Sequence, residues 1–237
     1  MLVIGIPSRN GIITIDFAMQ LQALRMHYIN GIAYAVAIGM PVADARNGIV
    51  KTALINKADY VMFIDDDTMI PDNAIAALLQ ADRDIITGVV YSKEEDEYLR
   101  SPMVFKAGQP FTTSDGKVHE IDSCGSACIL IKARVFSELA EKGYDGKWYT
   151  FFNETKVEST LDSNGKEMNT PNVINKGEDI NFCDLAKANG FKIHVHTGIQ
   201  CGHLDIEKMR VYSKIGVEDI SKRMNNYNVD HLKQKVN

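Results

Sequence analysis

The first ninety residues alternate between short apolar runs and stretches with helical periodicity. Uninterrupted apolar runs bounded by Gly, Pro or Asp predict strands that are buried on both faces of a parallel sheet. Between them, apolar residues recur three and four positions apart, which predicts amphipathic helices. Strands that alternate with helices predict an α/β fold, with a Rossmann-like sheet flanked by helices. The expected strands are 2–6, 32–38, 60–64 and 85–91, and the expected helices are 16–28, 43–57 and 71–79.

The pattern changes after about residue 100. Short strand candidates between 103 and 131, with a hairpin turn at 114–117, predict antiparallel additions to the sheet. Residues 153–176 are polar and predict a long mobile loop that closes over a ligand. A helix over 178–189, with Gly190 as its C-terminal cap, precedes a strand at 192–196.

The length of the chain favours one domain. Its 237 residues, 45% of them hydrophobic, supply enough apolar material for a single α/β core. We expect a nucleotide-binding half (1–100), an acceptor-side half (101–205) and a basic helical tail (206–237).

Charge and cysteine content limit the classes of partner. A net charge of −5 and a pI near 5.7 exclude nucleic acid as the expected partner. Four cysteines without a CxxC unit favour reduced thiols over a disulfide framework or a zinc site, so we expect a cytoplasmic protein. No apolar stretch approaches the roughly 20 residues of a membrane span. Contact of the basic tail with an anionic membrane surface is an open alternative to a solvated helix, and the oligomeric state is open.

Three consecutive aspartates follow the third expected strand. On an extended strand end, Asp65 and Asp67 point to one face and Asp66 to the other. Ligands of such sheets sit at the carboxyl ends of the strands, and two adjacent desolvated carboxylates repel unless a cation lies between them. The run therefore predicts a divalent cation site. Capping of the following helix is the competing interpretation.

Several motifs, in their order along the chain, resemble those of GT-A glycosyltransferases, in particular the family 2 group. The string FIDDDT resembles the DxD region, and Ala45-Arg46-Asn47 precedes it as in that family. Gly177-Glu178-Asp179 resembles the xED motif, and Cys201-Gly202-His203 resembles the segment whose histidine completes a metal shell. The stretch 123–130 is similar to the small-residue segment beside the sugar site. The similarity extends over about residues 1 to 205.

The resemblance implies a metal-dependent glycosyltransferase that moves a sugar from a nucleotide-diphosphate donor to an acceptor hydroxyl. Asp179 would be the catalytic base of an inverting reaction, with Glu178 sharing that role. Asp65, Asp67 and His203 would bind Mn²⁺ or Mg²⁺, which acts as a Lewis acid on the departing diphosphate. Acidic residues are also common in the first turn of a helix, so Glu178 and Asp179 have a purely structural interpretation. His194 and His196 compete with His203 as ligands.

The expected donor is a nucleotide-diphosphate sugar. Candidate donor-binding residues lie at the ends of the first three expected strands and at the start of the second helix. They are Pro7, Arg9, Asp44, Arg46, Asn47, Asp65 and Asp66. A solvated helix face is the alternative for Arg46 and Asn47.

Two other function classes compete with a glycosyltransferase. A nucleotidyltransferase also combines an α/β sheet with metal-binding carboxylates, but Pro7-Ser8-Arg9 is not its expected glycine-rich loop. A non-catalytic nucleotide-sugar-binding protein would share the fold. Neither GxGxxG nor GK[ST] occurs in the chain, which disfavours dehydrogenases and P-loop enzymes.

Overall fold

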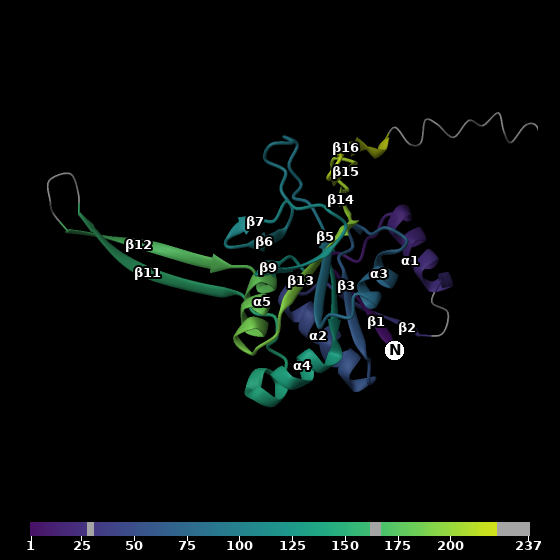
Figure 1. Cartoon of the computed structure of the whole chain (residues 1–237), viewed down its shortest axis with the longest axis horizontal. Helices are drawn as coiled ribbons and strands as arrows, with labels where there is room; N and C mark the ends of the chain where they lie inside the picture. Colours follow the sequence, from purple (N-terminus) through teal and green to yellow (C-terminus); the bar gives the residue numbers. More distant parts are fainter. Residues whose placement is uncertain (28–30, 162–166, 222–237) are drawn as a thin grey trace, which may run out of the picture.

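In the computed structural model the chain forms a mixed sheet with helices on both faces (Figure 1). The structure describes residues 1–27, 31–161 and 167–221. The central sheet has seven strands in the order β2-β1-β3-β10-β5-β13-β8. These strands are β1 (Leu2–Ser8), β2 (Ile32–Ile38), β3 (Tyr60–Ile64), β5 (Ile85–Val89), β8 (Val118–Ile121), β10 (Cys128–Lys132) and β13 (Ile193–Gln200). The expected mixed α/β fold is confirmed.

Except for the helix at Ala133–Leu139, which was not predicted, the described helices lie close to the positions that the periodicity predicts. Together they build a core on each side of the sheet. Val50 and Phe136 pack on one face together with Phe182, and Phe17 and Leu78 pack on the other. All five side chains are fully buried. The helices are α1 (Ile15–His27), α2 (Val42–Ile55), α3 (Ala74–Gln80), α4 (Ala133–Leu139), which continues into the wider turn η1 (Ala140–Tyr144), and α5 (Glu178–Ala188). Gly190 follows α5 with φ +92°, as expected of a glycine after a helix C-terminus.

One strand of the second half enters the middle of the sheet. β1 pairs in parallel with β2 and β3, as predicted, but β10 then runs antiparallel between β3 and β5. The antiparallel addition that the sequence predicts within 103–131 therefore lies inside the sheet. A buried apolar run has the same sequence pattern in either direction, so periodicity does not reveal strand order. β10 brings the small residues 125–127 beside Asp65, whose amide donates to the carbonyl of Ala127.

The polar segment 153–176 is not the loop that the sequence predicts. It forms an antiparallel ribbon of β11 (Phe152–Leu161) and β12 (Glu167–Lys176), which projects from the body (Figure 1). A projecting ribbon has no face against the core, so its strands lack the apolar alternation by which buried strands are recognised. The expected centre of the loop, 162–165, lies outside the described residues.

The segment after His203 is also not the expected helix. β14 (Gly202–Asp205), β15 (Arg210–Ser213) and β16 (Gly216–Asp219) form a small sheet with β4 (Thr68–Met69). Two of its basic residues, Lys208 and Arg210, form ion pairs with Glu95. The rest of the predicted tail, including Lys222 and Arg223, lies outside the described residues.

The hairpin turn predicted at 114–117 is not observed: the chain bends at 115–117, but the bend does not connect paired strands. β8 pairs with β13, and β7 (Gln109–Pro110) pairs with β6 (Val104–Lys106), which also pairs with β9 (Ser123–Cys124). Among the described helices, none is long and apolar enough to span a membrane.

Candidate functional site

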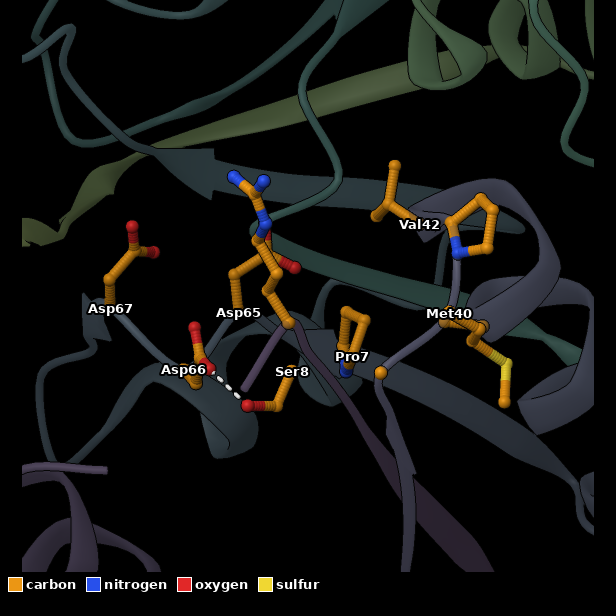
Figure 2. A pocket seen from close by; sticks show the side chains of 11 residues that line it. Pro7, Ser8, Met40, Val42, Asp65, Asp66 and Asp67 are labelled. Atoms are coloured by element: carbon orange, nitrogen blue, oxygen red, sulfur yellow. Dashed lines mark hydrogen bonds between the residues drawn. The ribbon is translucent and has the colours of Figure 1, made fainter. Parts of the chain in front are cut away.

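A cavity lies where β1, β2 and β3 finish. It has a volume of about 580 Å³, within the range of small-molecule sites. Its walls come from the ends of these strands, the loop after β2 and the first turns of α2 (Figure 2). The lining residues include Pro7, Ser8, Arg9, Met40, Asp65 and Asp67. A cavity therefore lies at the carboxyl edge of the sheet, where the sequence predicts a ligand site.

The three aspartates form a turn instead of an extended strand end. β3 ends at Ile64, and the amide of Thr68 donates to the carbonyl of Asp65 at 2.9 Å. The turn separates the side chains, so Asp65, Asp66 and Asp67 each contact a different partner. The expected sharing of one face by Asp65 and Asp67 is not observed.

Asp65 belongs to a buried ionic cluster with Arg46 and Glu178. One guanidinium nitrogen of Arg46 lies 3.0 and 3.1 Å from the two carboxylate oxygens of Asp65, and another contacts Glu178. Arg46 is only 3% exposed and lies over the rings of Phe63 and Tyr149. Burial opposes its charge, but Asp65, Tyr149 and Glu178 outweigh this and raise the pKa of Arg46. This cluster joins α2, the end of β3 and the start of α5.

A second, smaller cavity of about 260 Å³ adjoins the first, and both are lined by Val42 and Asp65. Its wall includes Gly125, Glu178, Asp179 and His203. A Cβ on Gly125 would lie 3.5 Å from an oxygen of Asp179, so the glycine leaves space in front of that carboxylate. Burial raises the pKa of Asp179, against a hydrogen bond from the Ile180 amide and the charge of Arg46.

The two residues of the predicted acid pair are in different environments. Arg46 holds Glu178, whose pKa is nevertheless raised by burial. Asp179 keeps one oxygen on the Ile180 amide at 2.7 Å and turns the other toward Gly125. Both carboxylates line the smaller cavity, and Asp179 is the one that the Arg46 guanidinium does not hold by a direct hydrogen bond.

Asp66 faces the end of β1. The Ser8 hydroxyl donates to Asp66 at 2.5 Å, as the dashed line in Figure 2 shows. Burial raises the pKa of Asp66, and the Ser8 hydrogen bond opposes the shift. Ser8 also accepts from the Gly11 amide at 3.0 Å, so this pair fixes the turn after β1 on the cavity wall.

Asp67 lies against two nitrogen-bearing side chains. The Lys93 ammonium is 2.6 Å and the His203 Nε2 is 3.3 Å from the same Asp67 oxygen. Burial acts to raise the pKa of Asp67, but the hydrogen bonds and charges of His203 and Lys93 prevail and lower it to about 2. Sequence analysis predicted Asp67 and His203, and the structure brings them together.

The orientation of His203 fits a cation ligand. Its Nδ1 lies 2.8 Å from the carbonyl oxygen of Tyr91, which can only accept, so Nδ1 carries the proton. When the ring is protonated, Nε2 donates to Asp67; when the ring is neutral, the Nε2 lone pair faces Asp67 and is open to a cation between them. A backbone acceptor behind a ring nitrogen is the usual support of a metal-binding histidine.

The remaining expected ligand, Asp65, does not fit this set, because Arg46 occupies both of its oxygens. Among the described residues, no group of three His, Cys, Asp or Glu side chains is arranged to hold a metal. Asp67 and His203 would therefore supply two ligands. The other coordination positions of such a site would be open to oxygen ligands from outside the chain.

The other predicted residues divide between the cavity and the scaffold. Pro7 and Arg9 line the larger cavity, but Asp44 is exposed and lines neither of the two cavities. Asn47 is buried and bridges the backbone of Tyr149, donating to its carbonyl at 2.8 Å and accepting from its amide at 3.0 Å. Its amide therefore positions a core residue and does not face the cavity.

The competing histidines lie elsewhere. His194 lines a different cavity with Lys192 and Glu120, and His196 accepts from the Gly198 amide. The four cysteines are buried free thiols.

Lys93 is the residue that sequence analysis missed. It follows β5, and a survey of polar residues just after each apolar run would have included it. Gln20 is a second supporting residue, since its amide accepts from Ile70 at 2.8 Å and donates to Thr68 at 3.2 Å. It ties α1 to the turn after Asp67, a contact that no pattern in the sequence indicates.

Comparisons with known proteins give a fold but no family. No protein family and no curated protein matches the chain. The structure of A197 from STIV is similar with a TM-score of 0.56 and 16% identity, over 90% of each chain. This likeness supports the fold alone.

Two more distant structures carry names of nucleotide-sugar enzymes. One is described as a UDP-N-acetylglucosamine pyrophosphorylase from Entamoeba histolytica, with a TM-score of 0.38 and 9% identity over 82% of this chain and 72% of that one. The other is a UDP-glucose phosphorylase from Trypanosoma brucei, with a TM-score of 0.35 and 8% identity over 73% and 57%. Likenesses this low carry no argument about the chemistry of the present chain.

Proposed function

We propose that this protein is a metal-dependent transferase that binds a nucleotide-diphosphate sugar across the two adjoining cavities and passes the sugar to an acceptor hydroxyl. The observation that carries the proposal is the placement of Asp65 between a cavity edged by Asp67 and a smaller one that contains Asp179. The larger cavity suits the nucleotide, and the smaller one suits the sugar and the acceptor.

The proposed chemistry is a single displacement. The Asp179 carboxylate takes the proton of the acceptor hydroxyl while that oxygen forms a bond to the anomeric carbon, and the nucleotide diphosphate leaves with the bonding electrons. Burial favours Asp179 as a base, because a raised pKa increases its proton affinity. Mn²⁺ or Mg²⁺ held by Asp67 and His203 would offset the charge of the leaving diphosphate.

The scaffold residues prepare this geometry. Arg46 holds Glu178 and Asp65 in place, which fixes the first turn of α5 against the end of β3. The residue next to Glu178 is Asp179, so the orientation of the base depends on Arg46. Lys93, beside Asp67, is a second cation available to the diphosphate.

Nucleotidyl transfer is the second candidate function. It would use the same strand end, where Asp67 lies beside the Lys93 ammonium and could hold a metal against phosphates. In that reaction a sugar phosphate attacks a nucleoside triphosphate and pyrophosphate leaves, so no carboxylate is needed to deprotonate an alcohol. The acid pair beside the smaller cavity supports glycosyl transfer instead.

One experiment separates the two reactions. UDP-, GDP- and CDP-sugars are tested by calorimetry with and without Mn²⁺, and the nucleotide that binds is then incubated with metal. Slow release of the nucleoside diphosphate indicates glycosyl transfer to water, and release of a nucleoside triphosphate on addition of pyrophosphate indicates nucleotidyl transfer. Failure of every nucleotide to bind with metal present would overturn both.

Asp67→Asn tests the metal site within the same assay. We expect metal-dependent binding to be lost, because a ligand and a negative charge are removed together. The matched control is Asp72→Asn, which changes an exposed aspartate outside both cavities. Equal binding by the two variants would remove Asp67 from the site.

Asp179→Asn tests the base. We expect turnover to fall by about 10²- to 10⁴-fold, with nucleotide affinity unchanged. In the unchanged protein, turnover should rise with pH through a pKa above the ordinary value of an aspartate, because burial raises the pKa of Asp179 and only its ionised form accepts a proton. A rate that persists in the variant with the same pH profile would assign the proton transfer to another group.

A further inference from the structure

The free edge of the central sheet is a strand of unusual composition. β2 ends the strand order, so among the described strands only β1 pairs with it. It reads Ile-Ala-Tyr-Ala-Val-Ala-Ile, without a charge or a proline. Proteins normally protect such edges with charged residues, prolines or bulges, because the unpaired amides and carbonyls attract another strand.

The hydrogen bonds at the two ends of β2 show which of its backbone groups point away from β1. The carbonyl of Gly31 accepts from Leu2, and the amide of Gly39 donates to Ser8, so the odd-numbered residues direct their backbone groups toward β1. Backbone direction alternates along a strand. The even-numbered residues, from Ile32 to Ile38, therefore direct their amides and carbonyls away from the sheet.

The sequence of β2 is nearly the same when read in reverse. A two-fold axis through Ala35 sets Ile32 opposite Ile38, Ala33 opposite Ala37, and Tyr34 opposite Val36 of a second copy. In this register the outward backbone groups of even-numbered residues face one another and can form the paired hydrogen bonds of an antiparallel ladder, with Ala35 at a non-hydrogen-bonded position.

The side chains on one face of β2 are complementary in the same register. The first half of the strand is covered by α1, where the Tyr34 hydroxyl donates to the Leu21 carbonyl at 2.8 Å. Beyond α1, Val36 and Ile38 are 57% and 54% exposed. Antiparallel pairing would place Val36 beside Tyr34 of the other copy and Ile38 beside Ile32. Each copy would then cover the exposed side chains of its partner.

We propose that β2 is a homodimer interface, at which two copies of the chain join edge to edge and form one continuous sheet. A dimer of this kind is isologous, because the same strand serves both partners. The proposal is independent of the proposed transferase activity and of any ligand.

The first test is the mass of the full chain in solution by light scattering and sedimentation equilibrium over a wide range of concentrations. We expect two copies. Val36→Lys places a charge on an exposed side chain at the edge and should give a single copy. The control Ile215→Lys alters a side chain that is 97% exposed in the turn between β15 and β16, and should leave the dimer intact.

The second test reads the register. Ala35→Cys should form a disulfide with its own copy when copper(II) phenanthroline takes up the two electrons and the buffer takes up the two protons. Antiparallel non-hydrogen-bonded partners have Cα atoms about 4.5 Å apart, which a disulfide can span. Ala33→Cys should not cross-link with itself, but should do so when mixed with Ala37→Cys. The native cysteines are buried and do not compete.

Circular dichroism and the urea unfolding midpoint verify that each variant is folded. A single-copy mass at every concentration would overturn the proposal. So would a dimer that Val36→Lys leaves intact, or self-cross-linking of Ala33→Cys at the rate of Ala35→Cys.

Discussion

Two ionic clusters stand at the end of β3, one on each side of Asp66, and they differ in exposure and in the kind of cation. Around Asp65, the cation is the guanidinium of Arg46, whose side chain is 4% exposed. Around Asp67, it is the ammonium of Lys93, whose side chain is 32% exposed. A planar guanidinium holds two carboxylates in fixed geometry, but a lysine ammonium on a flexible stem can leave its partner.

The comparison indicates a division of labour within one run of aspartates. The Asp65 cluster fixes the relative positions of α2, β3 and α5, and both Asp65 oxygens are already in contact with Arg46. The Asp67 cluster pairs a carboxylate with an imidazole nitrogen and a more exposed lysine. Under the proposed function, Asp65 is therefore a positioning residue and Asp67 would be the metal ligand.

The largest expected effect comes from breaking the buried cluster. Arg46→Met should lower the free energy of unfolding by roughly 3 to 5 kcal/mol, because Asp65 and Glu178 are left as partly buried charges without a partner. Urea unfolding at neutral pH measures this loss. The deficit should shrink as the pH falls, because burial raises the pKa of Glu178, which then takes up a proton and loses its charge.

Arg46→Lys is the matched variant for that cluster. It keeps the positive charge but loses the fork that contacts both carboxylates, so we expect a smaller loss than with Arg46→Met. Equal losses in the two variants, independent of pH, would contradict the ionic interpretation and assign the effect to packing against Phe63 and Tyr149.

A smaller effect is expected from Asp67→Asn when a chelator removes divalent cations. The pKa of Asp67 is lowered from 3.8 to about 2 in the folded state, so its ionised form stabilises the fold above the unfolded pKa. The variant should lose about 2 kcal/mol of unfolding free energy at neutral pH. The difference from the unchanged protein should decrease as the pH falls below about 4 and approaches the folded pKa. A difference that stays constant over this range would show that the charge of Asp67 is not its source.

The smallest effect is expected from Lys93→Met. If the ammonium competes with a divalent cation for Asp67, its removal should tighten Mn²⁺ binding in the absence of nucleotide by about tenfold, or about 1.4 kcal/mol. Calorimetry measures the change, and Lys57→Met, at an exposed lysine after α2, is the control. Weaker Mn²⁺ binding in Lys93→Met alone would mean that Lys93 supports the metal site and does not compete for it.

The elements that sequence analysis predicted well are those with a buried face. β2 and β3 have the predicted bounds, and α5 starts at the predicted Glu178. Their apolar runs and periods reflect burial against the core, which is a local property of the sequence. The ribbon β11–β12 and the strands β14–β16 were not predicted, because strands that are not buried in a sheet lack that pattern.

The sequence by itself determined that an α/β sheet ends in an acidic run, and that Asp67, His203 and Asp179 are the residues to examine. Spacing along the chain indicated the carboxyl end of a strand, where parallel sheets collect their functional side chains. Motif order added Asp179 and His203, which are more than a hundred residues away from the acidic run.

Only the tertiary structure decided how these residues are divided. The turn at 65–68 separates the three carboxylates, and long-range contacts then assign Arg46 to Asp65, Ser8 to Asp66 and Lys93 to Asp67. The physical reason is that each partner comes from a different strand end or helix start. Their proximity depends on strand order and on the insertion of β10, and neither is encoded in local periodicity.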